Sequence, residues 1–190
     1  MLITYSRNMA IKRKEPCSKF HELLQQQIQN EFTASQQYVA LAVWFDNSDL
    51  PQLAKFFYRQ AVEERNHALA ITRYLMDIDH HVEIPGTGEV RNDFNEVTEL
   101  VELALEQEKG VTADFRILAK TAREQDDYQG EQFVQWFLKE QIEEVSKMTT
   151  LLNVVRRANG NLFDVENWLA REAAGDDGDS GMPPVAGGKL

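Results

Sequence analysis

The stretch of residues 59–67 combines an acid and a histidine at a spacing that suits a metal ion. Glu64 and His67 lie three positions apart inside a pattern of helical apolar spacing. Residues i and i+3 share one face of a helix, so both side chains can reach the same point in space. A carboxylate and an imidazole that meet there suit a transition metal such as iron. Because Glu-x-x-His also occurs by chance on solvated helices, the pair needs support from the rest of the chain.

A first predicted hairpin places another acid at the height of this pair. In an antiparallel hairpin, two residues lie at the same height when the turn sits midway between them. Glu31 and Glu64 are 33 residues apart, and their midpoint falls between Asn47 and Ser48, inside a predicted turn. The spacing therefore predicts that Glu31 faces Glu64 across the hairpin.

A second predicted hairpin repeats the plan. Glu108 and Gln141 are also 33 residues apart, and the midpoint between Glu108 and Glu144 is Asp126, in the second predicted turn. Each hairpin thus carries an acid on its first helix and a pair at i and i+3 on its second helix. With a rise of about 1.5 Å per residue, both sets lie about 25 Å from the hairpin ends, deep inside a bundle.

Buried acids at these heights require neutralisation. Several carboxylates in an apolar bundle are very costly unless a cation or a salt bridge compensates them. Lys and Arg are missing from the matching heights except for Arg65 and Lys109, whose positions point elsewhere on their helices. The spacing therefore favours bound metal cations over internal salt bridges.

The bulk properties exclude several classes of function. The chain has 190 residues, enough for one domain with a sizeable core, and a formal net charge of −11. The charge argues against non-specific binding to nucleic acid or to an anionic membrane and fits a protein that handles cations. Cys17 is the only cysteine, which suits a reducing cytoplasm. No apolar run approaches the roughly 18 residues of a membrane span, and we expect neither export nor membrane association.

Apolar residues recur at three- and four-residue steps over four long stretches, which predicts an all-α protein. The expected helices cover about 18–46, 51–79, 96–124 and 131–158, and a short fifth helix covers about 162–172. Pro51 fits the first turn of the second helix, with Ser48 or Asp49 as its cap. Asn159 and Gly160 supply the stop of the fourth helix.

The segment between the second and third predicted helices is unusually long for a compact domain. Residues 80–95 contain Pro85, Gly86 and Gly88 and show no regular period. A long crossover would turn the second and third helices parallel, as in some four-helix bundles. We expect a flexible arm at 1–16, a helical domain at 17–173 and a disordered tail at 174–190. A docking peptide for a partner is the alternative interpretation of the tail.

Several separated motifs carry a resemblance to a known family. Residues 18–172 resemble a bacterial non-haem ferritin, a member of the ferritin-like di-iron family. The motifs are Asn30-Glu31-Phe32 through Tyr38, residues 60–67, Glu106-Gln107-Glu108 and residues 135–144. The resemblance implies a ferritin-like four-helix bundle with one long crossover between the second and third helices, plus the short fifth helix.

The resemblance also implies the ligands of a di-iron site. Glu31, Glu64 and His67 would hold one iron, and Glu64 would bridge to a second iron. Glu108 and Glu144 would hold that second iron, with Gln141 close by.

An inward acidic site and a redox-active tyrosine are implied as well. The acidic site resembles a third iron site of some bacterial ferritins and comprises Glu63, Glu140, Glu143 and Glu144. A plain solvated acidic face is the other interpretation of that group. Tyr38 lies two turns beyond Glu31 on the same face, where a tyrosine of the family sits beside the irons. An ordinary core tyrosine is the alternative.

The function implied is iron storage and detoxification. The chain would be a ferroxidase that oxidises Fe²⁺ with O₂ or H₂O₂ and deposits a ferric mineral in a cytoplasmic shell of 24 identical subunits. No haem is expected, because Arg65 stands where bacterioferritins carry a haem-ligating methionine, and Glu143 replaces the histidine of their second Glu-x-x-His. The alternatives are a haem-carrying bacterioferritin, a DNA-protecting mini-ferritin and a di-iron oxygenase or rubrerythrin-like peroxidase.

Overall fold

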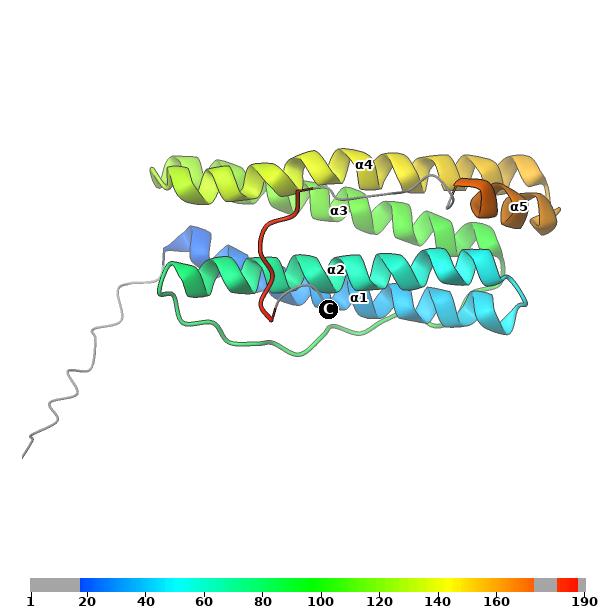
Figure 1. The fold of residues 1–190 in the computed structure, drawn as a ribbon, viewed down its shortest axis with the longest axis horizontal. Helices are drawn as coiled ribbons and strands as arrows, with labels where there is room; N and C mark the ends of the chain where they lie inside the picture. The colour runs from blue at the N-terminus through cyan, green and yellow to red at the C-terminus, as the bar shows by residue number, and fades with distance from the viewer. Residues whose placement is uncertain (1–17, 173–180, 188–190) are drawn as a thin grey trace, which may run out of the picture.

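Five helices and their connections make up the described part of this computed structural model, which covers residues 18–172 and 181–187. The helices pack in two layers, with α1 and α2 in one layer and α3 and α4 in the other (Figure 1). Their bounds are α1 Lys19–Asn47, α2 Pro51–Asp77, α3 Val97–Glu124, α4 Tyr128–Ala158 and α5 Leu162–Glu172. The predicted all-α bundle of four long helices with a short fifth helix is confirmed.

α1 begins and ends within a residue of its predicted bounds because its local signals are strong. The Ser18 hydroxyl accepts a hydrogen bond from the His21 amide at 3.2 Å and so caps the first turn. The helix ends at Asn47, and Asp49 takes a left-handed conformation with φ 57°. The chain reverses there, so α1 and α2 form the first hairpin.

The start of α2 differs from the predicted cap. Pro51 occupies the first turn as expected, but the N-cap residue is Leu50, and neither Ser48 nor Asp49 caps the helix. Glu166 of α5 does so instead, since its carboxylate accepts hydrogen bonds from the amides of residues 52 and 53 at 2.8 and 2.9 Å. Those amides have no partners within α2, and a carboxylate at a helix N-terminus also interacts favourably with the helix dipole.

The long crossover between α2 and α3 runs along α1 (Figure 1). Polar side chains four residues apart on one face of α1 hold its backbone by hydrogen bonds. Gln29 donates to the Gly86 carbonyl at 2.9 Å, and the Gly88 amide donates to Thr33 Oγ1 at 2.9 Å. Gln37 exchanges two hydrogen bonds of 2.7 Å with the backbone of Arg91. The predicted crossover is confirmed, and these contacts explain how an irregular segment follows a fixed path.

The second hairpin is tighter than predicted. α4 begins at Tyr128, three residues before the expected start at Glu131, and its N-cap is Asp127. Asp127 Oδ1 accepts a hydrogen bond from the Gly130 amide at 2.8 Å. Because this cap acts so early, the segment expected to be a five-residue turn is mostly helix. At the other end, Asn159 and Gly160 have φ 46° and 89° and stop α4 as predicted.

Two apolar clusters fill the bundle, one on each side of a buried polar layer. One cluster joins α1 and α2 to α3, α4 and α5 and includes Phe45, Phe57 and Leu100. The other joins the opposite halves of the four long helices and includes Phe20, Leu75 and Phe115. The buried charged residues lie at intermediate positions along the helices, and they are Glu31, Glu64, His67, Glu108, Glu140 and Glu144.

Residues 181–187 lie across α2 (Figure 1). Val185 is buried in the second apolar cluster, Met182 packs against the same cluster, and the Ala186 amide donates to the Leu69 carbonyl at 3.2 Å. We expected disorder throughout 174–190. That expectation does not hold for 181–187, because an apolar side chain and a backbone hydrogen bond attach this segment to the bundle. The expected arm at 1–16 and the rest of the tail lie outside the described residues.

None of the described helices combines the length and the apolar character needed to cross a membrane.

Candidate metal centre

α1 and α2 bring three predicted ligands together inside the bundle. Glu31, Glu64 and His67 are all buried, and each offers a ligand atom within 4.8 Å of the other two. His67 Nδ1 lies 3.3 Å from Glu64 Oε2, as their one-turn spacing predicted. The equal-height argument for the first hairpin is therefore confirmed for these three side chains.

A glutamine one turn earlier on α1 orients Glu31. The Gln27 amide donates a hydrogen bond to Glu31 Oε1 at 2.8 Å, and Gln27 is itself buried. Glu31 Oε2 has no partner among the described residues when the carboxylates are ionised, and it can hydrogen-bond Glu64 only if one of the two carboxyl groups is protonated. One oxygen of Glu31 is thus fixed by the protein, and the other remains for a ligand.

α3 and α4 supply the second half of the centre. Gln141 Nε2 donates to Glu108 Oε2 at 3.3 Å, and Gln141 Oε1 accepts from the Thr112 hydroxyl at 3.0 Å. The single hydrogen of the Thr112 hydroxyl is shared between this contact and the Glu108 carbonyl oxygen at 2.8 Å, so the Glu108 carboxylate is the group that orients the NH₂ group of the Gln141 amide. Glu144 is fully buried one turn after Gln141. All three predicted residues of the second hairpin lie in the bundle interior.

Tyr38 links the two halves. It lies on α1 with Glu31, and its hydroxyl donates a hydrogen bond to the Glu108 carboxylate on α3. The Tyr38 ring is fully buried and packs against Phe57, with ring centroids 5.8 Å apart. Tyr38 is thus a core residue that also contacts a carboxylate, and its redox role stays a prediction.

Burial raises the pKa of every carboxyl group in the centre. Desolvation is the largest cause for Glu31 and Glu64, and a nearby carboxylate adds to it: Glu64 for Glu31, and Glu108 for Glu64. The pKa of Glu108 is also raised by burial, although hydrogen bonds from Tyr38 and Gln141 oppose the shift. The metal-free centre therefore favours protonated carboxyl groups.

Glu144 has a pKa raised to about 7, mainly by burial and next by the charge of Glu63. Lys147 partly opposes this shift, because its ammonium lies 2.7 Å from Glu144 Oε1. This ion pair corrects the expectation that no cationic side chain matches the heights of the acids. Lys147 follows Glu144 by three residues on α4, so its flexible side chain can reach back one turn to the carboxylate. The comparison of heights across each hairpin could not detect a contact between two residues of the same helix.

The donor set fits a metal cation. Glu31 Oε2, Glu64 Oε1 and Glu144 Oε2 are buried without a hydrogen-bond partner among the described residues. A buried carboxylate oxygen without a partner is unfavourable unless something neutralises it. Oxygen ligands with one imidazole nitrogen suit iron, and neighbouring hydrogen-bond donors such as Gln27, which donates to Glu31, hold such ligands in place.

A second acidic group adjoins the first. Glu63, Glu140 and Glu144 place carboxylate oxygens within 4.8 Å of one another, whereas Glu108 belongs neither to this group nor to that of Glu31, Glu64 and His67. Gln60 donates to Glu63 Oε2 at 2.6 Å. The predicted fourth member, Glu143, is exposed and does not join them. It is one residue away from Glu144, so the helix directs it about 100° away from the group.

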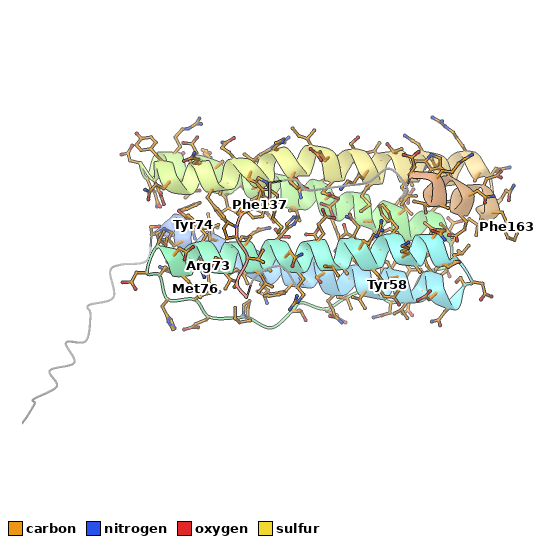
Figure 2. The ribbon with its side chains drawn as sticks, viewed as in Figure 1. Tyr58, Arg73, Tyr74, Met76, Phe137 and Phe163 are labelled. Atoms are coloured by element: carbon orange, nitrogen blue, oxygen red, sulfur yellow. The ribbon has the colours of Figure 1, made fainter. Side chains whose placement is uncertain are left out.

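Aromatic side chains close the centre beside His67. The His67 ring meets Trp136 and Phe137 edge-on, with ring centroids 5.7 and 5.6 Å apart. Phe137 lies between the two layers of the bundle (Figure 2). These rings exclude water from one side of the imidazole and fix its plane.

Three supporting residues were missed from the sequence. Gln27 precedes Glu31 by four positions and Thr112 follows Glu108 by four, so a search for polar side chains one turn from each ligand would have found both. Lys147 would have appeared in the same search, three positions after Glu144.

Comparisons with known proteins agree with this geometry. The family model described as "Ferritin-like domain" matches residues 21–158. The chain is 57% identical over 175 residues to "Ferritin BfrB" of Mycobacterium tuberculosis (strain Erdman), covering 92% of this chain and 97% of that protein. The corresponding protein of strain H37Rv is named "Bacterioferritin BfrB". "Bacterial non-heme ferritin" of Staphylococcus aureus (strain USA300) is 36% identical over 136 residues, covering 72% of this chain and 82% of that protein.

A solved structure shares the fold. An open-pore ferritin from the archaeon Archaeoglobus fulgidus superposes with a TM-score of 0.78 at 22% identity, covering 80% of this chain and 94% of that chain.

Proposed function

This chain belongs to the ferritin family, and from that premise we propose that it stores iron by oxidising Fe²⁺ at the buried carboxylate centre. Glu31, Glu64 and His67 hold one Fe²⁺, and Glu108 and Glu144 hold the second. Glu64 would bridge the two ions, and Gln141 would support the second one. Iron is the substrate and cargo of this site, which binds it as Fe²⁺ and releases it as Fe³⁺ toward a ferric mineral.

The observation that carries the proposal is the set of buried carboxylate oxygens without partners. Glu31, Glu64 and Glu144 each have one such oxygen, and they come from α1, α2 and α4. Glu31 and Glu64 converge with the His67 imidazole, and Glu144 converges with Glu63 and Glu140, which is expensive for a metal-free bundle and useful for a cation. Cation binding supplies the positive charge that the described residues provide only through Lys147.

The side chains of the centre bind and orient the metal in distinct ways. Gln27 keeps one oxygen of Glu31 occupied, so that the other oxygen faces the site. The Gln141 amide donates to the Glu108 carboxylate and so holds it, and the Thr112 hydroxyl contacts Gln141 Oε1 at 3.0 Å. When Fe²⁺ binds, the raised pKa values mean that carboxyl protons must leave, since the metal takes the deprotonated form.

Oxidation then follows from the hardness of the ligands. Carboxylate oxygens favour Fe³⁺ over Fe²⁺, so a centre rich in them lowers the reduction potential of its iron. Two Fe²⁺ ions release two electrons, which reduce O₂ to H₂O₂ or H₂O₂ to water. Tyr38 donates its hydroxyl hydrogen to Glu108 and so lies where it can supply a further electron and proton. Glu63, Glu140 and Glu144 receive Fe³⁺ on its way from the centre.

The assembled form we propose is a cytoplasmic homo-oligomer of 24 subunits that binds neither nucleic acid nor membrane. The division into an arm at 1–16, a bundle at 17–173 and a tail at 174–190, with the segment 181–187 docked on α2, belongs to the same proposal. Gel filtration tests the assembly, because a shell of 24 chains of 21.8 kDa has about twice the mass of a mini-ferritin dodecamer.

Anaerobic Fe²⁺ titration followed by O₂ tests the iron chemistry. We expect about two rapidly oxidised irons per chain in the wild type. Glu64→Gln and His67→Ala should slow oxidation by more than about tenfold with helical content unchanged. Glu106→Gln is the matched control, since this exposed acid of α3 lies two residues from Glu108 and points away from the centre. Wild-type rates in both site variants would reject the assignment.

We propose that the chain binds no haem, in contrast to what the name of one relative suggests. Arg65 is exposed on α2 and offers no thioether ligand, and Met76 lies three turns further along the same helix. Purified protein supplied with haem should show no stoichiometric Soret band. A band at one haem per two chains would overturn this part of the proposal.

A further inference from the structure

A cavity of about 440 Å³ lies where α5 packs against α2 and α4. Its volume falls in the range of small-molecule sites, about 300–1,000 Å³. None of the proposed iron ligands lines it. Its walls combine the side chains of three helices that are distant in the sequence, and α5 lies at one end of the bundle (Figure 1).

The cavity has an apolar side and a cationic side. Phe56 and Trp168 supply two aromatic faces, backed by leucines of α4 and α5. Lys55, Arg59 and Lys147 supply three cationic groups at the same cavity. Glu172 is the single acid among the described residues of its wall, so that part of the lining carries a net positive charge.

This positive charge stands out against the rest of the chain. The protein has 31 acidic and 20 basic residues, so a wall with three cations and one acid is unlike its average surface. Lys55 and Arg59 are four residues apart on α2, a spacing at which like charges repel. Neither side chain forms a hydrogen bond or an ion pair with another residue in the described part of the chain. An anionic ligand would relieve this repulsion.

Lys147 connects the cavity to the metal centre. Its side chain is 37% exposed and lines the cavity, while its ammonium contacts the fully buried Glu144. The cavity is therefore separated from an iron-binding carboxylate by one side chain.

We propose that this cavity binds a phosphate-type oxyanion carried on a small aromatic group. Lys55, Arg59 and Lys147 hold the oxyanion through charge-assisted hydrogen bonds, and Arg59 offers the planar fork that suits a phosphate. Phe56 and Trp168 contact the aromatic body. The binding does not depend on the iron chemistry, so it can be tested on iron-free protein.

Calorimetric titration of the assembled, iron-free protein tests the site with three probes. Phenyl phosphate carries both features, inorganic phosphate only the oxyanion, and phenol only the ring. We expect phenyl phosphate to bind at least about tenfold more tightly than either of the others, because it alone uses both sides of the cavity. Equal affinities for phenyl phosphate and phenol, or for phenyl phosphate and inorganic phosphate, would overturn the proposal, as would no binding at millimolar concentration.

The variant K55Q/R59Q removes the two unpaired cations and leaves Lys147 and the metal centre in place. Because the variant loses the charge-assisted hydrogen bonds of two cations, phenyl phosphate affinity should fall by about tenfold or more. Lys139→Gln is the matched control, an exposed lysine of α4 outside the cavity, and it should bind like the wild type. Quenching of tryptophan fluorescence by phenyl phosphate should disappear in Trp168→Phe. An unchanged affinity in K55Q/R59Q, with helical content intact, would overturn the assignment.

Discussion

The iron ligands should destabilise the protein whenever iron is absent, and Glu144→Gln measures this cost. Glu144 is fully buried, and its pKa is raised from 4.5 to about 7. The amide of Gln has the same shape but no charge to desolvate. The variant should therefore be more stable than the wild type in the metal-free state, even though it loses a proposed ligand.

The size of the effect follows from the pKa shift. Folded Glu144 binds its proton more tightly than unfolded Glu144, so the folded state loses relative stability as pH rises from about 4.5 to about 7 and stays constant above. At about 1.4 kcal/mol per pKa unit, the cost is on the order of 3 kcal/mol at pH 8 and below about 1 kcal/mol at pH 5. The opposing effect of Lys147 is already contained in the raised pKa.

Thermal unfolding in the presence of a chelator is the assay. For a chain of this length, about 1 kcal/mol corresponds to roughly 2–4 °C, so Glu144→Gln should raise Tm by about 6–12 °C at pH 8 and by under about 4 °C at pH 5. Glu143→Gln is the control, because it removes the adjacent exposed carboxylate and should change Tm little at either pH. Anaerobic Fe²⁺ should stabilise the wild type more than Glu144→Gln.

A result that would refute the reasoning is a Tm of metal-free Glu144→Gln at or below the wild-type value at pH 8, with unchanged helical content. Burial of this carboxylate would then carry no net cost, and the need for a cation in the centre would lose its physical basis.

Three further predictions concern the scaffold. Gly130→Ala should lower stability by about 1–3 kcal/mol in thermal unfolding, since the new Cβ would lie 2.8 Å from both Phe20 Cζ and Asp127 Oδ2. Gly110→Ala is the control: this position of α3 has open space, so the variant should raise stability by up to about 1 kcal/mol. Glu166→Ala should cost about 0.5–2 kcal/mol by uncapping α2, and Glu166→Gln, which keeps one acceptor, should cost less. Val185→Asp should detach residues 181–187 from α2, and hydrogen exchange at the Ala186 amide should become faster. Unchanged protection of that amide would contradict the attachment of this segment to α2.

The sequence by itself determined the helices and the heights of the buried acids. Apolar spacing of three and four residues fixed each long helix to within a few residues, because that period is a local property of the chain. Equal spacing about two turns then placed Glu31 opposite Glu64 and Glu108 opposite Gln141, since an antiparallel hairpin converts sequence distance into height. The glycine and asparagine after α4 marked its end for the same local reason.

Only the tertiary structure decided the contacts made by residues distant in sequence. Glu166 caps α2 from more than 100 residues away, and no local signal distinguishes it from other acids of α5. Val185 fills a place in the core that apolar spacing could not assign, because a single valine in a Gly- and Pro-rich segment has no period.

The same holds for the cationic cavity. Lys55 and Lys147 belong to different hairpins, and the packing of α2, α4 and α5 brings both to one cavity. Periodicity reports which face of a helix is buried, whereas the partners of that face depend on how all five helices pack in three dimensions.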